Sequence, residues 1–186
     1  MFSNLLNRKT PEELREFIAG RRCPDAIAVA ILQNKNTPID VLLEYTHCEE
    51  IVNSLYLPIE VYDKIIREKN KAIISRLCRV EHTPSIVLEK IFKLYKHDEA
   101  IQFDLCRSKN SKISSDMLHE LSMSTSWEVR AKVAKHNNVE LRDLVTLQQD
   151  VEPRVLIALR EVFIKNGFIP NLDKKEWGKI STIKIA

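Results

Sequence analysis

Pairs of aliphatic residues, four positions apart, recur along most of the chain. Val129 and Val133 form the clearest pair, in the stretch SWEVRAKVAKHNNVELRDL (126–144), where basic residues surround them and His136-Asn137-Asn138 interrupts the pattern. Residues four apart share one face of an α-helix. The stretch therefore predicts the end of one helix, a polar break and the start of another. The pairs are Ile27/Ile31, Ile51/Leu55, Ile73/Leu77, Ile101/Leu105, Val129/Val133 and Val155/Leu159.

Helix-start signals lie between these pairs. Thr10-Pro11, Thr37-Pro38 and Thr83-Pro84 each place a hydroxyl before a proline, and Leu57-Pro58 keeps the proline. A threonine side chain can cap free N–H groups, and proline fits the first helical position. We expect each of these threonines to cap a helix, with an acid near the first turn completing the signal. Weaker versions of the signal occur at Ile113-Ser114-Ser115-Asp116 and Val139-Glu140.

Together the two signals predict a repeating unit of two short helices. The first members of the pairs are 24, 22, 28, 28 and 26 residues apart. A unit of this size cannot bury its own apolar face, so neighbouring units must stack. We predict an all-α fold, an α-solenoid of about six helical-hairpin repeats over residues 1–170. We expect residues 171–186 to form a C-terminal tail or arm, and the short second repeat to contain a tightened turn before Pro58.

The run from Glu128 to Val155, EVRAKVAKHNNVELRDLVTLQQDVEPRV, resembles the leucine-rich repeat variant family, a relative of HEAT and armadillo solenoids. The resemblance is carried by an acidic-Val-Arg opening, a Val-Ala step, an asparagine break and a Leu-rich helix that ends in Asp. It is good over residues 113–165 and extends further only as a pattern. It implies a HEAT-like stack in which α-helices can alternate with short 3₁₀ helices. The matching parts are Glu128-Val129-Arg130, Val133-Ala134, Asn137-Asn138, Leu144 with Leu147, Asp150 and Asn36-Thr37-Pro38.

Composition agrees with a globular helical protein. The 186 residues are 44% hydrophobic and 30% charged, with 3 Gly and 7 Pro, which suits helices joined by short turns. No apolar run approaches the roughly 20 residues of a membrane span. The N-terminal sequence lacks the apolar core of a secretory signal. Usage rich in Lys, Ile and Asn indicates an AT-rich genome, bacterial or phage.

Four cysteines are present, none in a C-x-x-C pair, which predicts free thiols and a cytoplasmic location. Cys78 and Cys106 share a register with the apolar residues Leu32 and Ala134, so we expect both to be buried core residues. The histidines make no H-x-x-x-H pair and are expected in exposed turns. We therefore expect no metal, no cofactor and, without a phosphate loop or nucleophile motif, no enzymatic activity.

Basic residues are the strongest candidates for a site. Arg79, Arg107 and Lys135 each follow the second aliphatic of a pair by two residues, 28 residues apart each time. Stacking would align them as a ladder, with Arg76, Arg130 and Lys132 nearby. Three interpretations remain open: a solvated face that covers the core, a surface for an acidic protein, and a surface for a phosphate backbone.

These observations favour a non-enzymatic protein–protein interaction or scaffold module that binds another protein through the solenoid surface. One alternative is a nucleic-acid-binding solenoid that uses the basic ladder. The other is a structural subunit of a larger assembly, such as that of a phage, with the tail reaching into a neighbour.

Overall fold

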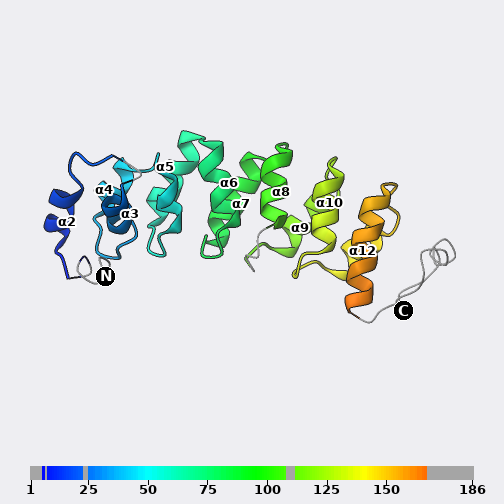
Figure 1. Ribbon diagram of the computed structural model, residues 1–186. Coiled ribbons are helices and arrows are strands. Elements are labelled where there is room, and N and C mark those ends of the chain that lie inside the picture. Colours follow the sequence, from blue (N-terminus) through cyan, green and yellow to red (C-terminus); the bar gives the residue numbers. More distant parts are fainter. Residues whose placement is uncertain (1–5, 7, 23–24, 108–111, 167–186) are drawn as a thin grey trace.

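The computed structural model describes residues 6, 8–22, 25–107 and 112–166, and this part of the chain is all-helical. It contains eleven α-helices, one 3₁₀ helix and no strand, which confirms the all-α prediction. The helices follow one another in chain order along one long axis, from α2 at one end to α12 at the other (Figure 1). Their bounds are α2 Pro11–Ile18, α3 Ala26–Leu32, α4 Ile39–Glu44, η1 Glu49–Asn53, α5 Ile59–Glu68, α6 Lys71–Arg79, α7 Ser85–Leu94, α8 Glu99–Arg107, α9 Ser115–Ser122, α10 Trp127–Ala134, α11 Leu141–Leu147 and α12 Pro153–Lys165.

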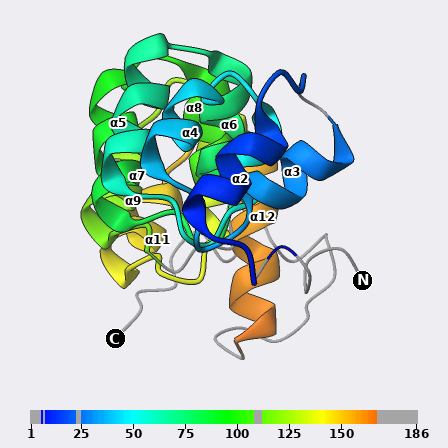
Figure 2. The same ribbon diagram turned by 90° about the vertical axis from the view of Figure 1, so that its left-hand side faces the viewer.

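The helices form two layers. On one side α3, η1, α6, α8, α10 and α12 pack against each other in that order, and we call them the second-helix layer. On the other side lie α2, α4, α5, α7, α9 and α11, the first-helix layer, in which α4 contacts α5, α5 contacts α7 and α9 contacts α11. The view along the long axis shows the two layers side by side (Figure 2). The core lies between them.

The paired aliphatics build most of this core. Both members of the pairs in α6, α8, α10 and α12 are buried, and so is Ile31, with Ile27 half-buried beside it. Leu55 is the exception, because its side chain is 67% exposed and η1 ends before it. Ile51 lies seven residues before Pro58, as Leu77 lies seven before Pro84. It is therefore the second member of its pair, and the predicted Ile51/Leu55 register was wrong by one helical turn.

The threonine–proline signals divide into two kinds. At Thr10 the predicted cap is present, because its hydroxyl accepts from the Glu13 N–H at 3.2 Å and its own N–H donates to the Glu13 carboxylate at 2.7 Å. At Thr83 the prediction was wrong, since Pro84 itself is the residue before the helix and no side chain caps it. The Thr83 hydroxyl donates instead to the Leu77 carbonyl oxygen at 2.8 Å.

Thr37 makes the same kind of bond, to the Ile31 carbonyl oxygen. Both threonines are buried and tie the start of a first-layer helix to the end of the preceding second-layer helix. At Thr37 and Thr83 the signal thus marks the connection between helices, whereas at Thr10 it marks a side-chain cap.

The second unit contains the 3₁₀ helix η1, at the place where a tightened turn was expected before Pro58. A 3₁₀ helix needs fewer residues per turn than an α-helix, which suits the shortest unit. The predicted tail, residues 171–186, lies outside the described residues. Among the described residues, no helix has both the length and the apolar character needed to cross a membrane.

Candidate functional site

The six basic residues predicted as a binding surface all lie on the second-helix layer. Arg76 and Arg79 belong to α6, Arg107 is the last residue of α8, and Arg130 and Lys132 belong to α10. Lys135 directly follows α10. Stacking therefore places them on one side of the molecule, but their contacts differ.

Three of the six form ion pairs with an acidic residue of an adjacent helix in the layer. Arg76 Nη1 lies 3.2 Å from Glu49 of η1, and Arg79 Nε lies 3.7 Å from Asp104 of α8. Lys135 pairs with Glu161 of α12. These contacts connect neighbouring helices, so much of the charge of the predicted ladder is compensated within the chain.

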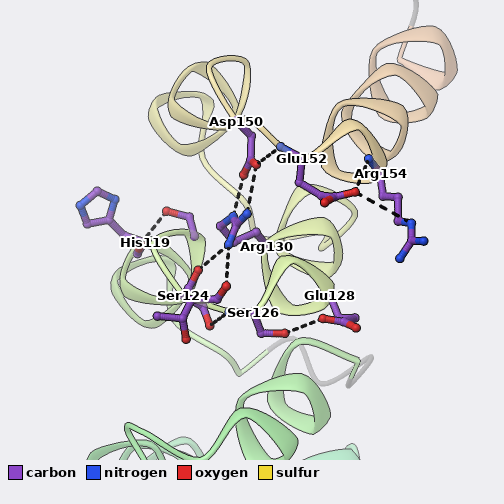
Figure 3. Close-up of polar contacts among 10 residues, drawn as sticks. His119, Ser124, Ser126, Glu128, Arg130, Asp150, Glu152 and Arg154 are labelled. Atoms are coloured by element: carbon purple, nitrogen blue, oxygen red, sulfur yellow. Dashed lines mark hydrogen bonds and ion pairs between the residues drawn. The ribbon is translucent and has the colours of Figure 1, made fainter.

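The hydrogen bonds of Arg130 are all made within the protein and connect two loops. Its Nε and Nη2 donate to the two carboxylate oxygens of Asp150 at 2.6 and 3.0 Å, and its Nη1 donates to the carbonyl oxygens of Ser124 and Thr125 at 2.7 and 3.0 Å (Figure 3). Its side chain is only 17% exposed. The guanidinium holds the pKa of the Asp150 carboxyl below its ordinary value. Arg130 thus joins the loops that precede α10 and α12 and offers little surface to a partner.

Two of the six cations remain without an acidic partner among the described residues. Arg107 is exposed at the end of α8. The Lys132 ammonium lies 5.6 Å from the centre of the Phe103 ring. A second stack of this kind involves a residue that the sequence analysis did not select: the Arg154 guanidinium lies 4.6 Å from the centre of the Trp127 ring. Cations over aromatic faces are attracted by the ring quadrupole, by about 0.5–1 kcal/mol at exposed positions.

The two stacks border a hollow of about 340 Å³ between α8, α10 and α12. We call it the α10 hollow. The Phe103 and Trp127 side chains are half-buried in its wall, and Ile157 of α12 is 56% exposed. The residues that line it are Phe103, Trp127, Glu128, Ala131, Lys132, Lys135, Arg154, Ile157 and Ala158.

Part of this site had a visible signal in the sequence. Trp127, Ala131 and Lys135 are spaced at four residues and so share one face of α10. Trp127 and Phe103 were expected only to fill space between repeats. The contribution of Arg154 and Ile157 depends on how α12 packs against α10, which no local pattern specifies.

A second hollow, of about 580 Å³, lies between η1 and α6. Its lining includes Arg76 and Arg79, which already pair with Glu49 and Asp104. No aromatic ring lines it, and polar atoms make up a larger share of its walls than in the α10 hollow. The remaining lining residues are Glu49, Asn53, Ala72, Ser75 and Val80. Of the two hollows, the α10 hollow therefore offers the stronger combination of apolar surface and available charge.

The cysteines follow the prediction only in part. Cys78 and Cys106 are buried free thiols, as expected from their register, and burial raises the pKa of both, to about 12 for Cys106. Cys48, however, is disulfide-bonded, against the expectation of free thiols. Because the other two described cysteines are free, its partner lies outside the described residues. Disulfides are uncommon in reducing compartments, so the cysteines give the expected cytoplasmic location no further support.

Histidines and acids form no metal site within the described residues, where no group of three or more potential ligands comes together. His136 is buried, which corrects the expectation of exposed turn histidines. Its Nδ1 accepts a hydrogen bond from the Asn138 N–H at 3.1 Å, so it shapes the turn after α10 from within. His119 Nδ1 lies 2.7 Å from the fully buried carboxylate of Asp143 and links α9 to α11.

Comparison of the chain with protein-family models, with curated proteins and with solved structures finds no match. The likeness to leucine-rich repeat variant solenoids therefore stays a prediction, and the assignment of a function depends on the geometry described above.

Proposed function

We propose that the chain is an α-solenoid of six helical-hairpin repeats, similar to leucine-rich repeat variant and HEAT-like proteins. We propose further that it is a non-enzymatic module that binds another protein, in the cytoplasm, through its second-helix layer. The two-layer packing supports the repeat assignment, and so do the matching bonds of Thr37 and Thr83 to the preceding helix. Ion pairs between successive first-layer helices, such as Arg15–Asp40 and Lys90–Asp63, recur at nearly one repeat length.

The α10 hollow is the observation that carries the proposed function. Aromatic residues and arginine are enriched at the centres of protein interfaces, where they supply much of the binding energy. Phe103, Trp127 and Ile157 expose apolar surface here, and Lys132 and Arg154 lie beside them. The Phe103 and Trp127 rings pack against the core, and each has a cation stacked on it, so ordering these side chains costs less conformational entropy on binding.

The alternatives have less support. A phosphate backbone is best held by a row of cations that are free to release counterions. Arg76, Arg79 and Lys135 instead pair with acids of adjacent helices. The alternative of a structural subunit relies on the tail, which lies outside the described residues.

A pair of matched isoleucine variants tests the proposed function. Ile157 in the α10 hollow and Ile86 on α7 of the opposite layer are 56% and 53% exposed. The tagged full chain and its Ile157→Asp and Ile86→Asp variants are used to capture partners from a lysate of the native host, with and without nuclease. We expect Ile157→Asp to lose the protein that the wild type and Ile86→Asp retain. Equal retention by both variants would overturn the assignment of this surface, and loss on nuclease treatment would favour nucleic acid.

A further inference from the structure

We infer that the α10 hollow binds an acidic segment of a partner protein that carries one large apolar side chain between carboxylates. The apolar side chain enters between Trp127 and Ile157, and the carboxylates meet Lys132 and Arg154. This inference rests on the proposed function, and it adds the chemical class of the ligand.

The size and walls of the hollow define the apolar part of the ligand. Its volume of about 340 Å³ is at the lower end of ligand pockets, which typically measure roughly 300–1,000 Å³. Its apolar lining comes from three successive helices, with Phe103 on α8, Trp127 and Ala131 on α10, and Ile157 on α12. A hollow of this size and lining suits one leucine or aromatic side chain.

The cations around the hollow define the charged part. The Lys132 ammonium lies over the Phe103 ring and makes no ion pair within the described residues. The Arg154 guanidinium lies over the Trp127 ring, and its contact with Glu152 is long, at 3.9 Å. A stacked guanidinium keeps its N–H edges free for a carboxylate. Both cations are therefore held in place by rings and retain donors for an anion.

The acids near the hollow already have partners. The Ser126 hydroxyl donates to the Glu128 carboxylate at 2.8 Å, and this bond, with a smaller contribution from the charge of Arg154, lowers the pKa of Glu128. Glu161 pairs with Lys135. A basic ligand would compete with these internal contacts, whereas an acidic ligand meets Lys132 directly. By the same argument residues 167–186, with four lysines against one Asp and one Glu, are mismatched in charge to this site.

Fluorescence of Trp127 gives a direct measurement. The chain has two tryptophans, and the full-length Trp177→Phe variant leaves Trp127 as the sole reporter. This protein is titrated with a capped peptide in which one leucine is flanked by glutamates. The comparison ligands are a peptide with serine in place of leucine, a peptide with lysines in place of glutamates, and oligo-dT. We expect saturable binding of the Glu–Leu peptide, and binding at least tenfold weaker for the other three.

Charge-reversal variants localise the binding. In the Trp177→Phe background, Lys132→Glu and Arg154→Glu are each expected to lower the affinity for the Glu–Leu peptide by about tenfold or more. The matched control is Arg67→Glu, an exposed arginine of α5 on the other layer, which should leave the affinity unchanged. Circular dichroism verifies that each variant is folded. If a charge-reversal variant unfolds, Lys132→Gln or Arg154→Gln replaces it, and we then expect a smaller loss of affinity for the Glu–Leu peptide.

The outcomes separate this inference from the proposed function. Three results would overturn the inference of an acidic ligand. They are equal binding of all peptides, tighter binding of oligo-dT, and no binding of the Glu–Leu peptide. If Ile157→Asp still abolishes capture of the natural partner in that case, the surface is correct and only the ligand class is wrong. If Ile157→Asp also leaves capture intact, both the proposed binding surface and the inferred ligand class are wrong.

Discussion

The guanidinium of Arg130 and the carboxylate of Asp150 form a two-bond ion pair that joins the loop before α10 to the loop before α12 (Figure 3). Asp150 Oδ1 also accepts the Glu152 N–H at 2.9 Å, and Nη1 of Arg130, a residue of α10, donates to two carbonyl oxygens of the loop before α10. One arginine side chain thus satisfies groups from two turns. The pair is one of the least exposed in the described part of the chain, at 17% and 6% of the two side chains.

Removal of Arg130 should destabilise the protein strongly. Arg130→Ala leaves a largely buried carboxylate and two carbonyls without their donor, which costs about 2–4 kcal/mol of unfolding free energy. Lys135→Ala is the control, because its pair with Glu161 is exposed and such pairs contribute about 0–1 kcal/mol. Urea unfolding followed by circular dichroism measures both. Equal small losses would show that the Arg130 cluster has no special role.

The Arg130–Asp150 pair should also make the free energy of unfolding depend on pH, with a loss of stability in acid. The Arg130 hydrogen bonds lower the pKa of Asp150 in the folded protein, against burial, which raises it. In the unfolded chain an Asp carboxyl has a pKa of about 3.9. The contribution is therefore fully present above that value and is lost as the pH falls through the lower pKa of the folded state.

Asp150→Asn isolates this contribution. We expect the variant to be less stable than wild type at pH 7, and the difference in unfolding free energy to shrink at pH 3. Urea unfolding of both proteins at the two pH values tests this. A difference that is independent of pH would exclude titration of Asp150 as its source.

In the second unit the helical register differs from the one that the sequence pattern predicted. Periodicity alone paired Ile51 with Leu55, because four-residue spacing cannot distinguish a full α-helix from the single 3₁₀ segment that lies there. Counting back from Pro58 would have placed Ile51 correctly. The prolines therefore set the register more reliably than the aliphatic pairs.

The candidate site was less predictable. The six predicted basic residues lie on the second-helix layer, but pairs such as Arg76–Glu49 arise between residues 27 positions apart. The stack of Arg154 on Trp127 likewise depends on the packing of α12 against α10. Ion pairing and stacking across helices decide which cations are available, and these depend on three-dimensional packing more than on local spacing.

Thr83 provides a test of the connection between layers. Its buried hydroxyl donates to the Leu77 carbonyl oxygen, and Thr83→Val preserves the shape but removes this donor. A buried acceptor left without a partner costs about 1–3 kcal/mol. Thr146→Val on α11 is the control, since that exposed hydroxyl bonds to the carbonyl one turn earlier in its own helix. Urea unfolding should show a loss of this size for Thr83→Val and a change within about 0.5 kcal/mol for the control. Similar values for the two variants would contradict the proposed tie.

The cysteines allow a chemical test of the core. Cys48 is disulfide-bonded, whereas Cys78 and Cys106 are buried thiols whose pKa values are raised by burial. Because the thiolate is the reactive form, both should react very slowly with Ellman's reagent in the native protein. In urea without reductant we expect two thiols per chain, and four after reduction. Cys78→Ala with Cys106→Ala should leave none before reduction. Four thiols in the unreduced, unfolded chain would instead show that Cys48 is free, and rapid native reaction would show that the helices around Cys78 and Cys106 open readily.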